Sequence, residues 1–289
     1  MDILVLQQEL ELIQQNDYSF IENIDLIQLT LEMVQHIGTT NSYIREMLIF
    51  KCLVHFIQEN FLSTEHLETL LVKCLSDEFL YFEIQTPGTD GVFTRSYTIL
   101  LIALIIKYDT MQPFLSYEMV QKVKNSLIKY MNVEKDYRGY IQDKGWANSI
   151  IHGSEAFHTL VLNPNIKGIC EEEILHCLLN KVFVEDIVYY NQEDERIAIP
   201  ILAVIHNGFS KDRFISILDK KIKRLPQMQK KNSTQEYFVL YANIKNFLRA
   251  LFFKIKETLN QNPFLMQIER MLKEFRCYFY LESMPLNKS

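Results

Sequence analysis

The sequence contains little glycine and proline, with eight and seven residues respectively in a chain of 289. This is about half the usual share of these two residue types. A protein built from antiparallel strands needs many tight turns, which glycine and proline commonly supply. The scarcity therefore argues against an all-β fold. The abundant leucine, isoleucine, lysine, glutamate and glutamine favour helix instead.

A strongly basic segment is also missing. The net charge is −6, and the densest group of basic residues, at positions 220–224, is short and follows Asp219. Non-specific binding to nucleic acid requires a stripe of lysine and arginine that neutralises phosphates. We therefore expect no nucleic-acid partner.

The sequence shows neither a leader nor a membrane span. The first residues, MDILVLQQELEL, lack a positively charged region and a cleavage-like site. The longest apolar run, residues 99–106, is far shorter than the roughly 20 residues that cross a bilayer. We therefore expect a cytoplasmic protein that does not contact a membrane.

The cysteines are odd in number and widely spread. Most lie within apolar helical stretches, so reduced thiols in the core explain them best. Cys170 and Cys177 flank a possible base, His176, but closeness in sequence does not establish closeness in space. We interpret all of the cysteines as structural: Cys52, Cys74, Cys170, Cys177 and Cys277.

Apolar residues recur at helical spacing along most of the chain, and no segment shows the sustained alternation of a strand. Residues 92–108 are apolar nearly all round, which predicts a central, covered helix. Asn41 or Ser42 can cap one expected helix and Ser116 another. Helices are expected over residues 3–15, 22–37, 43–59, 64–76, 92–108, 117–131, 145–161, 171–184, 194–206, 211–224, 234–259 and 264–281.

Many of these helices form consecutive pairs of roughly 35–45 residues, although no clear sequence repeat is present. Pairs of this length are typical of a right-handed α-α superhelix, a HEAT- or armadillo-like stack of about twelve helices here. We therefore predict an all-α protein with a single elongated domain over residues 1–289. Residues 230–235, KKNSTQ, are the best candidate for a linker.

Residues 134–158 concentrate what is rare elsewhere in this chain. They hold the only tryptophan, Trp146, and three of the eight glycines. In a helix that begins near residue 145, Trp146 would share an apolar side with Ile150 and Phe157. Trp146 is therefore expected to be a core residue. Gly153 flanks the same side and would let another helix or loop approach closely.

Polar residues of the same stretch form the candidate site. Asn148, His152 and Glu155 are spaced i, i+4 and i+7, so they would form one stripe opposite the apolar side. An ordinary solvated helix face has the same spacing and is the alternative. Asp136 and Arg138 lie in the preceding loop and can brace it through a forked ion pair. That structural role is at least as well supported as a functional one.

Two further charged positions are unusual for their surroundings. Arg95 projects from the same side of its helix as Ile99 and Ile106. An unpaired buried charge costs several kcal/mol, so Arg95 requires a partner. In the segment EDER, Glu193 can pair with Arg196 three positions later. An acidic helix start that complements the helix dipole is the simpler explanation for this segment.

Three motifs stand out: VFTRS at 92–96, DYRGY at 136–140 with GWA at 145–147 and HG at 152–153, and EDER at 193–196. With these motifs the chain resembles an uncharacterised bacterial family, the domain-of-unknown-function family 2785. The resemblance covers roughly residues 85–210 well. It implies an all-helical fold and no agreed activity.

The central motif of that family resembles G-W-A-H-x-x-x-H-G-x-D. In this chain Asn148 stands where the first histidine is expected, and Glu155 where the aspartate is expected. The full pattern would offer three metal ligands on one helix face. Asn148 removes one good ligand, so we expect neither a metal nor a cofactor.

Two functions fit these residues. The first is a helical scaffold whose polar groove around His152 binds a protein, a peptide or a small polar or anionic ligand. No P-loop, dinucleotide, nucleophile-elbow or zinc-protease motif argues for specific chemistry. The second is an enzyme in which His152 acts as general acid or base, oriented by Glu155 or Asp136. Arg138 or Arg95 would then hold an anionic group. The candidate ligand-binding residues are Arg95, Arg138, Asn148, His152, Glu155, Glu193 and Arg196, and the candidate catalytic residues are His152, Glu155, Asp136 and Arg138.

Overall fold

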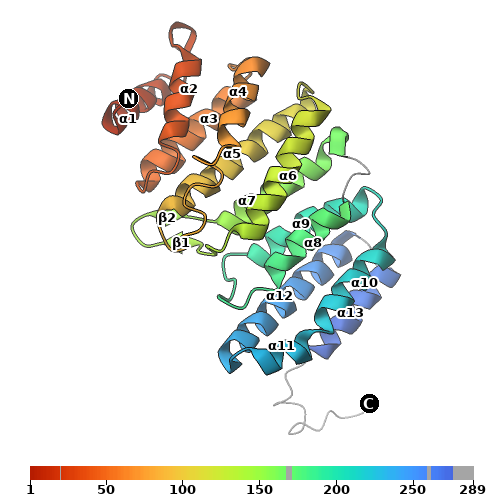
Figure 1. Cartoon of the computed structure of the whole chain (residues 1–289). Coiled ribbons are helices and arrows are strands. Elements are labelled where there is room, and N and C mark those ends of the chain that lie inside the picture. The colour runs from red at the N-terminus through yellow and green to blue at the C-terminus, as the bar shows by residue number, and fades with distance from the viewer. Residues whose placement is uncertain (20, 167–170, 259–261, 276–289) are drawn as a thin grey trace. The chain divides into compact units, whose positions relative to one another are not determined.

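The structure, a computed structural model, describes residues 1–19, 21–166, 171–258 and 262–275, and these residues form the predicted all-α fold (Figure 1). Among the described residues, β-structure is limited to two paired strands of two residues each, β1 (Tyr140–Ile141) and β2 (Gly145–Trp146). The part of the chain up to residue 162 holds α1 (Ile3–Gln15), α2 (Leu26–Gln35), the π-helix η2 (Tyr43–Phe50), α3 (Lys51–Gln58), α4 (Thr64–Cys74), α5 (Gly91–Met111), α6 (Tyr117–Val133) and α7 (Ser149–Leu162). The second half holds α8 (Glu171–Val182), α9 (Glu193–His206), α10 (Lys211–Ile222), α11 (Leu225–Lys231), α12 (Thr234–Thr258) and α13 (Pro263–Glu274). Two short 3-10 helices, η1 (Ile21–Asn23) and η3 (Pro164–Ile166), complete the described elements.

The chain divides into two compact units. The first unit comprises residues 1–178 and 199–204, and the second comprises the remainder. Residues 230–235, which were expected to be a linker, lie within the second unit, between the last turn of α11 and the first turn of α12. The expectation of one elongated domain stays a prediction.

Helix α5 is the centre of the first unit, as its apolar sequence predicted. Ile99, Ile102 and Ile106 are fully buried, and the helix packs against α3, α4 and α7. Among the described helices, α5 is long and apolar enough to cross a membrane, but 78% of its most apolar window is buried inside the protein. The core helix of a protein that crosses no membrane meets the same criteria.

Helices α5 and α7 lie side by side and run in the same direction (Figure 1). Ser96, early in α5, contacts His152, early in α7, with 2.7 Å between Ser96 Oγ and His152 Nδ1. Asp109, late in α5, accepts a hydrogen bond of 2.6 Å from the amide of Asn163, which follows α7. Helices two apart in sequence also pack together earlier in the unit, α2 on α4 and α3 on α5. Gly153 permits the close approach expected at α7, because a Cβ there would lie 2.8 Å from the sulfur of Met131.

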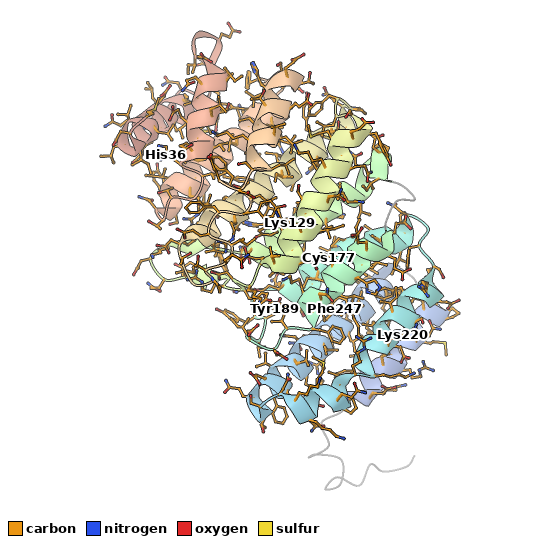
Figure 2. All side chains as sticks on the ribbon, viewed as in Figure 1. His36, Lys129, Cys177, Tyr189, Lys220 and Phe247 are labelled. Carbon is orange, nitrogen blue, oxygen red and sulfur yellow. The ribbon has the colours of Figure 1, made fainter. Side chains whose placement is uncertain are left out.

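The second unit is organised around α12, which packs against α11 and α13. Phe247 and Leu251 of α12 are fully buried, and Figure 2 marks the position of Phe247. Asn243 of the same helix is also buried, and its amide binds the carbonyl oxygens of Val184 and Ile187. A polar side chain of the core therefore holds the segment between α8 and α9.

The expected core thiols are confirmed where the structure describes them. Cys52, Cys74 and Cys177 are free and buried. Burial raises the pKa of the Cys74 thiol to about 12, so this group is not a nucleophile at neutral pH. The other two, Cys170 and Cys277, lie outside the described residues.

Candidate functional site

The motif at residues 136–147 forms a small antiparallel hairpin and not the start of a helix. Tyr140 pairs with Trp146 and Ile141 with Gly145 across strands β1 and β2. The helix expected from residue 145 begins at Ser149, because Gly145 (φ 81°) and Asn148 (φ 53°) adopt left-handed backbone angles. Such angles cannot continue an α-helix.

Trp146 is consequently not a core residue, and that prediction was wrong. Its side chain is 39% exposed, whereas Ile150 and Phe157, expected on the same side, are buried. Tyr140 is 50% exposed and lies directly opposite Trp146, so both rings project from one face of the hairpin. Their centroids are 5.2 Å apart, with 71° between the ring planes. The hairpin therefore presents a pair of aromatic rings to solvent.

A fully buried arginine, Arg45 of η2, binds the backbone of this hairpin. Its guanidinium donates to the carbonyl oxygens of Thr39 and Lys144, at 2.6 and 2.5 Å. The same group lies 4.2 Å above the ring of Phe93, a cation–π contact. Because Lys144 precedes β2, the hairpin backbone is fixed to the π-helix. Sequence reasoning missed Arg45, although its place within the apolar run YIREMLIF was an available signal.

Glu46 supports the hairpin from the next position of η2. One carboxylate oxygen accepts from Arg45 at 2.8 Å and from the backbone N–H of Trp146 at 3.3 Å. A Cβ at Gly145 would lie 2.7 Å from that same oxygen. Glycine is therefore needed at 145 both for its backbone angle and for this close approach.

The loop before the hairpin is braced by the forked ion pair predicted between Asp136 and Arg138. Arg138 Nε lies 2.8 Å from Oδ1 and Nη2 lies 2.6 Å from Oδ2 of Asp136. Asp136 also accepts from the backbone N–H of Gly88, and Arg138 donates to the carbonyl of Thr89. The pair thus joins this loop to the loop that precedes α5. The Arg138 side chain remains one-third exposed, two residues before Tyr140.

Replacing Asp136 with asparagine should cost about 1.5–3 kcal/mol at pH 7, because the charge-assisted bonds are lost. Burial raises the pKa of Asp136, but the bonds from Arg138 and Gly88 outweigh this effect, and the net pKa is lowered. The stability that ionised Asp136 contributes is present above its unfolded pKa, about 4, and is lost as the pH falls through the folded pKa. The difference in unfolding free energy between wild type and Asp136→Asn, measured by urea titration, should therefore shrink below about pH 4. A difference that stays constant from pH 7 to pH 3 would contradict this assignment.

Arg95 has the partner that its apolar surroundings required. Both Arg95 and Glu134 are fully buried, and two hydrogen bonds of 2.7 and 3.0 Å join them. The third guanidinium nitrogen donates to the carbonyl of Phe82 at 2.8 Å. Arg95 therefore has no surface at which a ligand could contact it in this structure, and its role here is to join α5 to the end of α6.

His152 of α7 is buried, with its ring packed against α5. Its Nδ1 lies 2.7 Å from the hydroxyl of Ser96, and its ring meets Tyr97 edge-on at 5.3 Å. Asn148 precedes the helix, so it does not share a helical stripe with His152 and Glu155. The Asn148 side-chain oxygen is buried and has no hydrogen-bond partner among the residues that the structure describes. Glu155 lies partly exposed on α7.

The remaining predicted residues, Glu193 and Arg196, belong to the second unit. Glu193 is buried at the first turn of α9 and accepts from the backbone N–H of Asn191 at 2.7 Å. Arg196 is exposed. No three histidine, cysteine, aspartate or glutamate side chains are grouped as a metal ion would require, within the residues that the structure describes.

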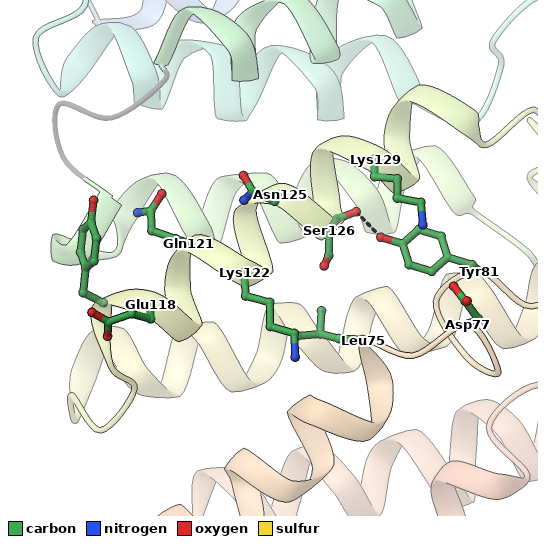
Figure 3. Close-up of a pocket in the computed structure, with 10 residues that line it drawn as sticks. Leu75, Asp77, Tyr81, Glu118, Gln121, Lys122, Asn125, Ser126 and Lys129 are labelled. Atoms are coloured by element: carbon green, nitrogen blue, oxygen red, sulfur yellow. Dashed lines mark hydrogen bonds between the residues drawn. The ribbon is translucent and has the colours of Figure 1, made fainter.

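A groove of about 600 Å³ crosses α6 in the first unit (Figure 3). Tyr81 forms part of its wall, with its hydroxyl donating to the Ser126 carbonyl and the Lys129 ammonium 4.1 Å from its ring. The groove contains none of the motif residues, and sequence reasoning did not anticipate it. Two lysines and two acidic residues line the groove, so its lining has no single sign of charge. The lining residues are Leu75, Asp77, Tyr81, Tyr117, Glu118, Gln121, Lys122, Asn125, Ser126 and Lys129.

Comparison with known protein families identifies a match. A family model described as "Protein of unknown function (DUF2785)" matches residues 80–253. This range begins before α5, includes the hairpin and its bracing loop, and ends within α12. No curated protein and no solved structure matches the chain.

Proposed function

The chain belongs to the DUF2785 family of proteins of unknown function, since the family model covers more than half of it, and we propose that it binds a protein or peptide partner through its hairpin. The binding surface consists of Tyr140 and Trp146, and we include Arg138, two residues before Tyr140, because its side chain is one-third exposed. We call these three residues the hairpin surface.

The observation that carries the proposal is the exposure of Trp146 on an immobilised backbone. Tryptophan is highly buried on average, and this chain has a large core that could have enclosed its single tryptophan. Tryptophan, tyrosine and arginine are also the residue types that dominate binding energy at protein interfaces. Because Arg45 and Glu46 already fix the hairpin, little ordering would be needed on binding.

The scaffold under this surface is, in our proposal, a right-handed HEAT-like superhelix. The parallel packing of α5 with α7, and of other helices two apart in sequence, supports this architecture. Stacked helix pairs commonly display binding surfaces for proteins and peptides. The proposal includes a cytoplasmic location, which the free thiols Cys52, Cys74 and Cys177 favour.

The hairpin surface replaces the groove around His152 as the proposed binding site. His152 is held against Ser96 between two helices, where a partner could not contact it without opening the core. The alternative in which His152 acts as general acid or base stays a prediction, and the hydrogen bond between His152 and Ser96 that it would use lies in the core.

A displayed library of random peptides tests this function. We expect selection on the wild-type protein to enrich peptides that do not bind the double variant Tyr140→Ala/Trp146→Ala. Tyr117→Ala is the matched control, because Tyr117 is 49% exposed and lies in the same unit, on the α6 groove. The proposal fails if every enriched peptide binds wild type and double variant equally, while both variants keep the far-UV circular dichroism of wild type.

A further inference from the structure

We infer that the partner of the hairpin surface is a proline-rich segment in the polyproline II conformation. The inference rests on the proposed function and adds the chemical class of the partner to it. Three features of the hairpin surface support it: the angle between the rings, their unused hydrogen-bond donors, and the paired charges around them.

The two rings form a corner that suits a proline ring. Tyr140 and Trp146 meet at 71° with centroids 5.2 Å apart, and each ring is at least 39% exposed. A proline side chain is compact and apolar, and in a polyproline II helix with three residues per turn it recurs on the same side. Aromatic-lined surfaces bind such segments because the rings pack against the prolines.

The same two side chains offer hydrogen-bond donors that the described part of the chain does not use. Neither the indole N–H of Trp146 nor the hydroxyl of Tyr140 has a hydrogen-bond partner there. A polyproline II segment has no internal hydrogen bonds, and its carbonyl oxygens all point to solvent. Donors from tryptophan and tyrosine can therefore bind the peptide backbone while the rings bind its side chains.

Three cationic side chains near the hairpin surface are paired with carboxylates, and Asp143 of the turn accepts a hydrogen bond of 3.0 Å from the amide of Gln142. Arg138 pairs with Asp136, Lys144 with Asp90 at 2.7 Å, and Arg45 with Glu46. These pairings leave an acidic peptide little electrostatic advantage at the hairpin surface. An uncharged, apolar and backbone-accepting partner fits better, and a proline-rich segment has all three properties.

An ammonium group is the alternative ligand for this pair of rings, because aromatic faces attract a cation. Such a site is strongest where a free carboxylate adds its charge. Glu46, the carboxylate bonded to Trp146, already pairs with Arg45. Glu46 therefore adds no free negative charge that would attract a cation to the two rings.

Fluorescence of Trp146 provides a direct test, since it is the only tryptophan of the chain. We expect decaproline to change the emission of the full-length protein in a saturable manner, and a glycine–serine peptide of the same length to leave it unchanged. Tyr140→Ala should weaken decaproline binding by about tenfold or more. Tyr140→Phe, which keeps the ring and loses the hydroxyl, should weaken it less. Tyr117→Ala should change it by less than about twofold.

Several results would overturn the inference. These are an absent or equal response to the two peptides, an unaltered affinity in Tyr140→Ala, or tighter binding of decalysine than of decaproline. A loss confined to Tyr117→Ala would place the peptide in the α6 groove instead. Library selection separates this inference from the proposed function. Hairpin-dependent peptides without proline would leave the function standing and refute the polyproline assignment.

Discussion

Replacing Glu134 with glutamine is expected to lower the free energy of unfolding by about 3–5 kcal/mol, the usual cost of leaving one charge of a buried pair uncompensated. The guanidinium of Arg95 would keep its charge in a site with 0% exposure. Glutamine has almost the same shape as glutamate, but its amide nitrogen would face the donors of Arg95. Chemical denaturation followed by circular dichroism measures the loss.

Lys144→Ala is the matched control for this prediction. It removes an ion pair of similar length, but Lys144 and Asp90 are 40% and 44% exposed. Exposed pairs contribute about 0–1 kcal/mol, so little stability should be lost. The double variant Arg95→Leu/Glu134→Leu should be less destabilised than Glu134→Gln alone, because it removes both charges together. A loss below about 1 kcal/mol for Glu134→Gln would show that the pair does not need its charge.

The need for this ion pair could be predicted from the sequence, but its partner could not. Arg95 lies in an apolar helix, and the cost of burying an unpaired charge requires a counter-charge nearby. Glu134 is 39 positions away in sequence, at the C-terminal end of α6, the helix that follows α5. Helical periodicity relates residues three or four positions apart, so it carries no information on such a contact. The Asp136–Arg138 pair was predictable because its members are two residues apart.

Most helices were predictable for the same local reason. An apolar stripe at helical spacing identified α1 over its full length and α5 and α6 to within a few residues. Helix α11 was missed because its sequence, LPQMQKK, is short and mostly polar. The π-helix η2 was predicted as ordinary helix, since the apolar pattern of a single turn does not distinguish the two.

The candidate site was the part that sequence reasoning placed least well. Treating residues 145–161 as one helix put Trp146 in the core and His152 on the surface, and the structure has the opposite arrangement. Gly145 and Asn148 carried the missing information, because both residue types accept left-handed backbone angles. The anchor beneath the hairpin, Arg45, is 99 positions from Lys144 and could not be inferred locally.

Phe157→Ala and Trp146→Ala should therefore have very different effects, although both remove an aromatic ring from the same motif. Phe157 is fully buried in α7, so its loss should cost about 3–5 kcal/mol through lost burial and a cavity. Trp146 is 39% exposed and makes one aromatic contact, with Tyr140, so its loss should cost less than about 1.5 kcal/mol. Circular dichroism must follow unfolding, because Trp146→Ala removes the fluorophore.

Equal losses in the two variants would show that Trp146 is packed like a core residue, and would remove the basis for the hairpin surface. The expected inequality has the opposite consequence. A side chain that contributes little to folding, on a backbone fixed by a buried arginine and a glutamate, is available for another molecule. Loss of peptide binding in Trp146→Ala, with stability nearly unchanged, would then separate recognition from folding within a single motif.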